Sequence, residues 1–189
     1  TYGMGEQVQF LSNHCKEYGI EHEIIDTKIY ELAGEKIRKN SSFCSFFSRM
    51  RRGYLYSAAL EQGYNKLALG HHLDDAMESF FMNFFYNGTM RSMPPIYKAE
   101  NGLMIIRPLI FCRERQLRAF AQANEINVIG DEACPAMRFD VKMPHARQKT
   151  KELLEKLEEE NPRIFVSMKA AFSNIQDSTF FDQEKFDLS

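Results

Sequence analysis

The 189 residues carry 24 basic and 26 acidic side chains, a net charge of −2, and 44% of them are hydrophobic. This balance excludes wholesale disorder and a polycation that binds nucleic acid without selectivity. No apolar run approaches the roughly 20 residues that cross a bilayer, and residues 1–10 lack a signal-peptide pattern, so the cytoplasm is the expected location. The chain opens on Thr1 rather than Met, which suggests that an upstream segment is missing.

The first half of the chain alternates helical and strand-like patterns. Apolar residues at helical spacing predict a helix before Gly19, and residues 20–26 predict a short strand. A helix is expected over about 42–62, with Gly63 as its stop, and residues 66–70 have the pattern of a short buried strand.

Residues 74–86 give the clearest helical pattern. Asp74 and Asp75 lie in its first turn, where the helix dipole favours anions. Its apolar side chains recur on one face, which predicts a core-facing stripe. These residues are Met77, Phe80, Phe81, Phe84 and Phe85.

The second half continues the alternation. We expect an extended segment at 93–95, a strand at 103–107, a helix at 113–124, a short strand at 127–129 and helices at 144–160 and 162–174. Strands that alternate with helices indicate an α/β domain with a mainly parallel sheet flanked by helices. We place this domain at 1–143 and a C-terminal helical segment with its tail at 144–189.

The segment Gly70-His71-His72-Leu73-Asp74-Asp75-Ala76-Met77-Glu78 concentrates ionisable side chains directly after the strand at 66–70. Ligands of α/β sheets bind at such strand ends. Two carboxylates at a helix start are suited to Mg²⁺, and imidazoles are suited to a nucleotide or a proton in transit. The residues alone leave open a second interpretation, in which the aspartates only cap the helix.

The four cysteines show no Cys-x-x-Cys pair, so their spacing indicates neither a disulfide framework nor a metal site. Cys44 begins a predicted helix close to arginines, which favours a reactive thiolate. Cys134 lies in a polar loop and is the second candidate. Cys15 and Cys112 are expected to be structural.

Two basic stretches are candidate phosphate-binding surfaces. Residues 36–52 contain no acid, and residues 138–151 contain one acid among several basic side chains. Guanidinium groups match phosphate oxygens well, so Arg49, Arg51 and Arg52 point to RNA as a partner, although a charged solvent face is the usual explanation of such a run.

A set of motifs, in this order and spacing, resembles the tRNA 2-thiocytidine synthetases (TtcA-like proteins), over roughly residues 9–174. The motifs are Cys44-x-x-x-Ser48-Arg49-x-Arg51-Arg52-Gly53, Leu69-Gly70-His71-His72-x-Asp74-Asp75, Phe85-Tyr86-x-Gly88, Met93-Pro94-Pro95, Ile106-Arg107-Pro108-Leu109 and Cys112-Arg113-Glu114. The resemblance implies the PP-loop ATP pyrophosphatase superfamily, with a Rossmann-like sandwich of the adenine nucleotide alpha hydrolase type.

The same resemblance implies a sulfurtransferase that uses ATP and Mg²⁺ to adenylate a cytidine in the anticodon loop of tRNA and then replaces its oxygen with sulfur. It also implies a sulfur donor protein and, as an open option, a homodimer. Residues carried over fall into three groups. They are Gly70, His71, His72, Asp74 and Asp75 for the nucleotide and Mg²⁺, Arg49, Arg51, Arg52 and Arg107 for RNA, and Cys44 and Cys134 for sulfur chemistry.

Two departures from the family pattern stand out. The family holds an iron–sulfur cluster with a Cys-x-x-Cys pair and one later cysteine, but here Phe47 replaces the second cysteine of the pair. This leaves Cys44 and Cys134 as two cluster ligands, as a persulfide-carrying pair, or as ligands of a different metal. The Ser-Gly-Gly-x-Asp-Ser loop that cradles ATP phosphates is not in the sequence, so the chain is expected to be catalytically impaired.

Two rival functions remain open at this point. A catalytically inactive relative would keep the arginines for tRNA and lose the chemistry. A lysidine-synthetase-like ligase would keep the ATP chemistry and modify tRNA cytidine with lysine.

Overall fold

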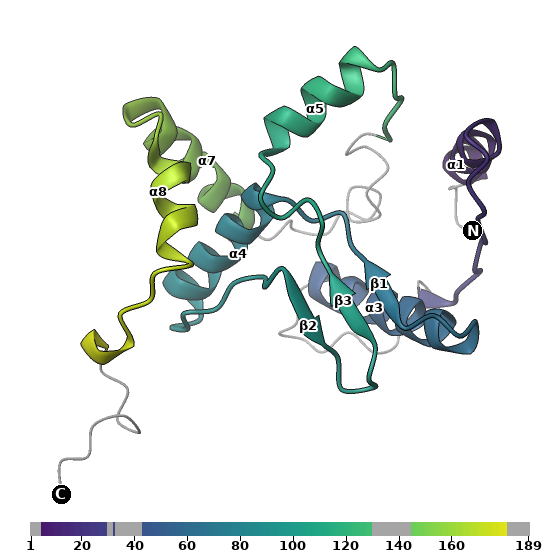
Figure 1. Ribbon diagram of the computed structural model, residues 1–189, viewed down its shortest axis with the longest axis horizontal. Helices are drawn as coiled ribbons and strands as arrows, with labels where there is room; N and C mark the ends of the chain where they lie inside the picture. The colour runs from purple at the N-terminus through teal and green to yellow at the C-terminus, as the bar shows by residue number, and fades with distance from the viewer. Residues whose placement is uncertain (1–4, 30–31, 33–42, 130–144, 181–189) are drawn as a thin grey trace, which may run out of the picture.

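A computed structural model describes residues 5–29, 32, 43–129 and 145–180. Its helices and strands follow in the order α1 (Gly5–Glu17), α3 (Phe43–Glu61), β1 (Lys66–Ala68), α4 (Leu73–Tyr86), β2 (Ile96–Lys98), β3 (Met104–Ile106), α5 (Glu114–Ala123), α7 (His145–Glu160), α8 (Ile164–Ala171) and the short 3₁₀ helix η2 (Asp177–Thr179). Figure 1 shows a small central sheet, with α3 beside it, α4 packed with α7 and α8 on one side, and α5 projecting away.

The sheet has the strand order β1-β3-β2. β3 pairs in parallel with β1, where Leu67 lies opposite Ile105, and antiparallel with β2, where Tyr97 lies opposite Ile105. The predicted α/β class is therefore confirmed, while the described sheet is mixed rather than mainly parallel. β2 was not predicted: the extended segment was expected at 93–95, and β2 begins directly after it at Ile96.

Two predicted strands do not form. Residues 20–26 and 127–129 have no strand structure. Ile24 is 54% exposed and Val128 is 73% exposed. A strand requires a neighbour for its backbone N–H and C=O groups, and neither segment finds one among the described residues.

Two separate apolar clusters hold the described part together. In the first, Ile105 and Leu103 are fully buried beneath Ala59 of α3, so this cluster fixes α3 on the sheet. In the second, Met77 of α4 packs with Leu154 of α7 and Phe165 of α8. The second cluster joins the C-terminal helices to the helix that begins the candidate site.

The aromatic stripe of α4 is only partly in the core. Met77 is fully buried and Phe81 packs at the edge of the cluster, but Phe84 and Phe85 are each 49% exposed. The expectation of one continuous core-facing stripe is therefore wrong for the C-terminal end of α4. The α7 and α8 helices and Phe172 cover α4 as far as Phe80 and Phe81 and leave Phe84 and Phe85 half-exposed.

The remaining helices agree with their predicted positions. Gly63, with φ +78°, ends the turn after α3, where a side chain would be strained. None of the described helices is long and apolar enough to cross a membrane. The predicted domain boundary between 143 and 144 lies outside the described residues and stays a prediction.

Candidate functional site

The loop Gly70–His72 leaves the sheet where parallel strands β1 and β3 end. The N–H of Leu69 donates to the carbonyl oxygen of Ile106 at 2.9 Å, which extends the pairing by one residue, and the chain then turns into α4. The N–H of Leu73 donates to the carbonyl oxygen of Cys112 at 2.9 Å, which ties the start of α4 to the segment after β3. The predicted site thus lies at the carboxyl edge of the sheet, the usual ligand position in α/β folds.

His71 faces a buried arginine at this edge. Arg107, one residue after β3, is 8% exposed. Its Nε donates to His71 Nδ1 at 3.4 Å and its Nη1 donates to the carbonyl oxygen of Pro94 at 2.6 Å. Its guanidinium carbon also lies 5.3 Å from the centre of the Tyr97 ring. Arg107 was predicted to contact RNA, but its side chain is committed to these protein contacts.

The surroundings of His71 disfavour its cationic form. Burial lowers the pKa of His71 below its ordinary value, and the charges of Arg107, Arg51 and Arg147 lower it further. Asp75 opposes this effect without reversing it. These surroundings therefore favour the neutral imidazole.

His72 has a different task, since it caps α4. Its Nδ1 accepts the N–H of Asp75 at 3.3 Å, and the Asp75 carboxylate accepts the N–H of His72 at 3.0 Å. This reciprocal pair satisfies two backbone donors that the first turn of a helix otherwise leaves unpaired. The helix-capping interpretation of this segment is correct for His72 and Asp75.

Asp74 points toward α5. Its two oxygens accept Arg113 Nε at 3.1 and 3.3 Å, and one of them also accepts the N–H of Glu114 at 2.7 Å. Arg113 in turn makes a bidentate ion pair with Glu158 of α7, at 2.5 and 2.7 Å. Asp74 therefore helps to hold α4, α5 and α7 together.

Asp75 and Glu78 share one arginine of α7. Arg147 donates to Asp75 at 2.8 Å through Nη2 and to Glu78 at 2.8 Å through Nε. Glu78 is 6% exposed, and burial raises its pKa although Arg147 acts in the opposite direction. These contacts dock α7 on the first turns of α4.

The two aspartates do not fit a Mg²⁺ site in this arrangement. Mg²⁺ needs several oxygen ligands that converge at about 2.0–2.1 Å. Each oxygen of Asp74 and Asp75 instead accepts an N–H from arginine or backbone. The described residues also contain no group of three or more His, Cys, Asp or Glu side chains placed to hold a metal.

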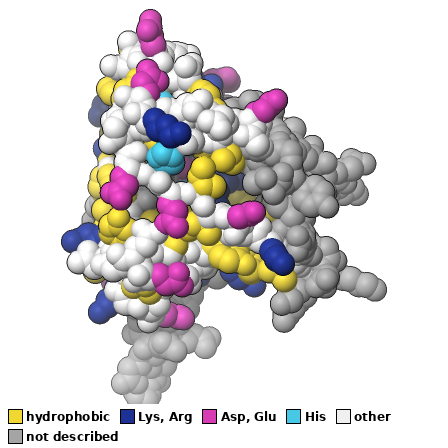
Figure 2. Space-filling view, turned by 90° about the vertical axis from the view of Figure 1, so that its right-hand side faces the viewer, with side chains coloured by type: hydrophobic (Ala, Val, Ile, Leu, Met, Phe, Trp, Pro, Cys, Tyr) yellow, Lys and Arg dark blue, Asp and Glu magenta, His cyan; other side chains and the backbone are white. Residues whose placement is uncertain are grey.

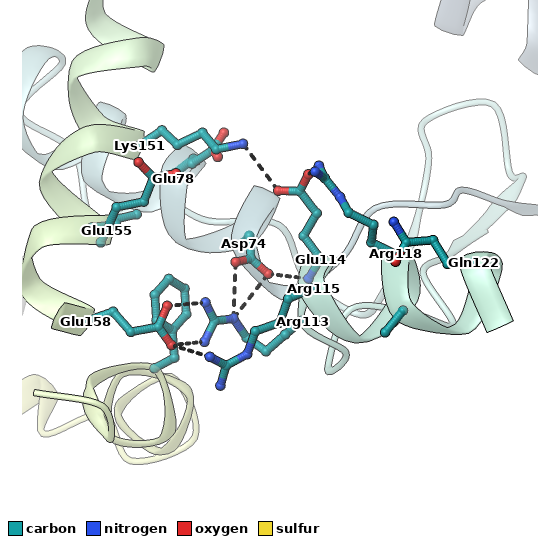
Figure 3. Close-up of a pocket in the computed structure, with 13 residues that line it drawn as sticks. Asp74, Glu78, Arg113, Glu114, Arg115, Arg118, Gln122, Lys151, Glu155 and Glu158 are labelled. Atoms are coloured by element: carbon teal, nitrogen blue, oxygen red, sulfur yellow. Dashed lines mark hydrogen bonds and ion pairs between the residues drawn. The ribbon is translucent and has the colours of Figure 1, made fainter. Parts of the chain in front are cut away.

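A polar groove lies behind these contacts (Figure 3). It has a volume of about 370 Å³ and is bordered by α4, α5 and α7, with Phe165 of α8. Figure 3 shows that acidic and basic side chains alternate along it and pair with one another, as Lys151 does with Glu114 at 3.3 Å. These ion pairs join different helices, so the groove marks the contact between α5 and α7.

The other predicted RNA-binding arginines lie on the surface. Arg49, Arg51 and Arg52 are exposed on α3, and Arg52 Nε donates to the carbonyl oxygen of Ser48 at 3.2 Å. On the face seen in Figure 2, acidic, basic and apolar side chains are interspersed, and no concentrated basic patch is visible. The three arginines of α3 thus remain the described candidates for phosphate contacts.

The positions of the two cysteine side chains predicted for sulfur chemistry are not described. Cys44 belongs to α3, but its side chain, like the whole of Cys134, lies outside the described residues. Phe47 is half-buried and its ring lies edge-on to that of Phe46, with ring centres 6.2 Å apart. A phenyl ring cannot ligate iron, so the three positions Cys44, Phe47 and Cys134 do not fit a family-type iron–sulfur cluster.

The sequence reasoning missed the roles of Arg113, Arg147 and Tyr97. Their partners are far away in sequence, so helical or strand spacing gave no signal. One hint was present, because Arg113 belongs to the Cys112-Arg113-Glu114 motif that carried the family resemblance.

Comparisons with known proteins define the class first. Residues 4–154 match the PP-loop domain family. The fold is similar to that of the U34-tRNA thiolase from Methanococcus maripaludis, solved with its [4Fe-4S] cluster, at a TM-score of 0.70 over 88% of this chain and 56% of that one. Sequence identity to that structure is 23%, so the likeness concerns the fold.

Closer relatives then define the group. The tRNA-cytidine(32) 2-sulfurtransferase of Geobacter metallireducens is 40% identical over 95% of this chain and 69% of its own length. The proteins of the same name from Syntrophotalea carbinolica and Ralstonia pickettii are 39% and 36% identical, with 68% and 58% of their lengths covered. The chain therefore belongs to the PP-loop domain family and, within it, to the family of the tRNA-cytidine(32) 2-sulfurtransferases. It spans between 58% and 69% of the length of these relatives.

Proposed function

We propose that the protein to which this chain belongs thiolates a cytidine in the anticodon loop of tRNA at the expense of ATP. The observation that carries this proposal is the 40% identity to a tRNA-cytidine(32) 2-sulfurtransferase over 95% of the chain. The position of Gly70, His71 and His72 at the carboxyl edge of β1 supports a nucleotide site there. The proposed partners are tRNA and a sulfur donor protein, the proposed location is the cytoplasm, and a homodimer stays a prediction.

The chemistry follows from the leaving group. The oxygen on C2 of cytosine does not leave readily, so ATP first transfers AMP to it and releases pyrophosphate. A sulfide-level sulfur from the donor then attacks C2, the C2–O bond breaks, and AMP departs with the oxygen. ATP supplies the activation when it is bound, and Mg²⁺ would accompany its phosphates.

The residues of this chain have separate tasks in the proposal. His71 contacts the nucleotide, His72 fixes the first turn of α4, and Arg49, Arg51 and Arg52 hold RNA phosphates. Cys44 and Cys134 are proposed to handle sulfur without a family-type cluster. Asp74 and Asp75 are not assigned to Mg²⁺, because arginines and backbone N–H groups occupy their oxygens.

Mass spectrometry of tRNA nucleosides tests this function directly. Cells without the full-length gene should lose 2-thiocytidine, and the intact gene should restore it. A Cys44→Ser gene should fail to restore it, while the matched Cys15→Ser gene should succeed, since Cys15 is a half-buried residue of α1 far from the proposed chemistry in sequence. Unchanged 2-thiocytidine in the deletion strain would refute the proposal.

One observation favours a second candidate. Phe47 stands where relatives of this kind are expected to have a cysteine, which suits a tRNA-binding protein that has lost catalysis. Purified full-length protein distinguishes the two functions. ATP-dependent release of pyrophosphate in the presence of tRNA would support the enzyme, and its absence together with tight tRNA binding would support the binding protein.

A further inference from the structure

Arg107 is the only described arginine whose side chain is buried and directed at a residue of the proposed nucleotide site. It is 8% exposed, and its contacts are His71 Nδ1 at 3.4 Å, the carbonyl oxygen of Pro94 at 2.6 Å and the ring of Tyr97 at 5.3 Å. A guanidinium group has hydrogen-bond donors and no acceptor, and it keeps its charge at all relevant pH values. The nitrogen of His71 that faces it must therefore present a lone pair.

From this geometry we propose that Arg107 is a positioning residue that holds His71 as the neutral imidazole with its proton on Nε2. His71 then offers a hydrogen-bond donor, Nε2–H, to an acceptor atom of the bound nucleotide. In this tautomer Nε2 has no lone pair, so His71 recognises its ligand and does not act as a general base. The identity of the ligand rests on the proposed function, whereas the tautomer does not.

Further contacts hold Arg107 in place. Tyr97 of β2 lies against the guanidinium, and its hydroxyl group lies 2.8 Å from the hydroxyl group of Tyr56 on α3. Burial raises the pKa of Tyr56 to about 12, so its hydroxyl group stays protonated near neutral pH. The N–H of Arg107 also donates to the carbonyl oxygen of Pro95 at 2.8 Å, which fixes its backbone.

The Nε2 side of His71 is proposed to face the ligand. The ring is half-buried, and none of the described residues forms a hydrogen bond with its Nε2. The charged groups that act on it are Asp75 of α4, Arg107 after β3, Arg51 of α3 and Arg147 of α7. Three of these are cations, which disfavours a second proton on the ring.

Nitrogen NMR of the 189-residue chain, labelled in its histidine rings, tests the tautomer without any assay of activity. The signal of His71 is assigned by its loss in His71→Gln. In the wild type we expect a proton on Nε2, none on Nδ1, and a titration midpoint below the ordinary histidine value. A wild-type ring protonated on Nδ1, or cationic at neutral pH, would overturn the proposal whatever the variants do.

Two substitutions at Arg107 test its part in this state. Arg107→Met removes the charge and the donors, so His71 should populate both tautomers and titrate at a higher pH. Arg107→Lys keeps a positive donor and should preserve the wild-type tautomer and the low midpoint. If Arg107→Met folds and leaves both quantities unchanged, Arg107 does not position His71. If Arg107→Met does not fold, the tautomer and titration midpoint of His71 in the wild type and in Arg107→Lys test the proposal.

An arm with the full-length enzyme separates this inference from the proposed function. Arg107→Lys should retain more thiolation activity than Arg107→Met, with the loss mainly in KM for ATP. The expected tautomer without thiolation would leave the inference standing and remove the proposed function. Thiolation by a protein whose His71 carries its proton on Nδ1 would support the proposed function and overturn the inference about Arg107.

Discussion

Arg113 shows how one partly buried side chain can join several helices. It pairs with Asp74 of α4 and Glu158 of α7, and its guanidinium carbon lies 3.4 Å from the centre of the Phe165 ring of α8. A partly buried cation needs such partners, because loss of one leaves a charge without compensation. The hydrogen bonds from Arg113 hold the pKa of Glu158 below its ordinary value.

Glu158→Gln should therefore destabilise the protein in a pH-dependent way. A depressed carboxyl pKa adds stability above the unfolded-state value, and this stability disappears as the pH falls through the folded-state value. At neutral pH we expect a loss of about 1–3 kcal/mol in the free energy of unfolding. The difference in unfolding free energy between the variant and the wild type should disappear below the ordinary glutamate pKa of 4.5. Urea unfolding over a pH series measures it, with the exposed neighbour Glu159→Gln as control. A gap that stays constant with pH would contradict the assignment.

Asp74→Asn tests whether this carboxylate is a docking group or a metal ligand. Because Asp74 accepts from Arg113 and from the N–H of Glu114, the variant should lose about 1–3 kcal/mol of stability without any metal present. Addition of MgCl₂ without ATP should leave the wild-type unfolding midpoint unchanged, since a ligand that binds only the folded state would raise it. A clear Mg²⁺-dependent rise in the wild type that is lost in Asp74→Asn would instead assign the metal to this residue.

Helix α3 divides its surface between two tasks. Ala59 packs on Leu103 and Ile105 of the sheet, whereas the three arginines near the middle of α3 are exposed. Placement on a packed helix keeps the three guanidinium groups close together, which is suited to a phosphate backbone. The element thus links the sheet to the proposed RNA-binding surface.

Replacement of Arg49, Arg51 and Arg52 by Gln should weaken tRNA binding and its salt dependence together. Loss of three phosphate contacts should reduce the magnitude of the slope of log affinity against log salt concentration by about 2 to 3. Filter binding over a salt series measures the slope. The matched control is the pair Arg115→Gln and Arg118→Gln on α5, whose side chains are 68% exposed and pair with glutamates. An unchanged slope in the triple variant would remove α3 from the RNA interface.

At the scale of the whole molecule, the described structure is held by two small apolar clusters rather than one. One lies between α3 and the sheet, and the other lies between α4, α7 and α8. The candidate site lies between them, because the loop at Gly70–His72 connects β1 to α4. Docking of the C-terminal helices therefore decides how firmly the site is held.

Leu154→Ala should be one of the most damaging substitutions in the C-terminal helices. Leu154 is 3% exposed and packs against Met77, so its truncation should cost about 2–5 kcal/mol. Leu153 is 38% exposed on the same helix, and Leu153→Ala should change stability by no more than about 0.5 kcal/mol. Thermal unfolding of the two variants measures the difference. Equal stability of the two variants would show that α7 does not dock as described.

Local pattern was sufficient for much of this protein. Helical spacing, a glycine stop and dipole-compatible aspartates predicted α3 and α4 within a few residues, because these signals act between neighbours in the chain. The motif order around His71 also indicated the family and the edge of the sheet where the candidate site lies. These properties depend on residues that are close in sequence.

Only the tertiary structure decided which side chains meet. Ile24 and Val128 have strand-forming character but find no neighbouring strand among the described residues, and β2 forms directly after two prolines because β3 is available to pair with it. Asp74, a metal candidate by residue type, is occupied by Arg113, and Arg107, an RNA candidate by charge, is buried against His71. Both outcomes depend on contacts between residues more than 30 positions apart, and no local spacing specifies such contacts.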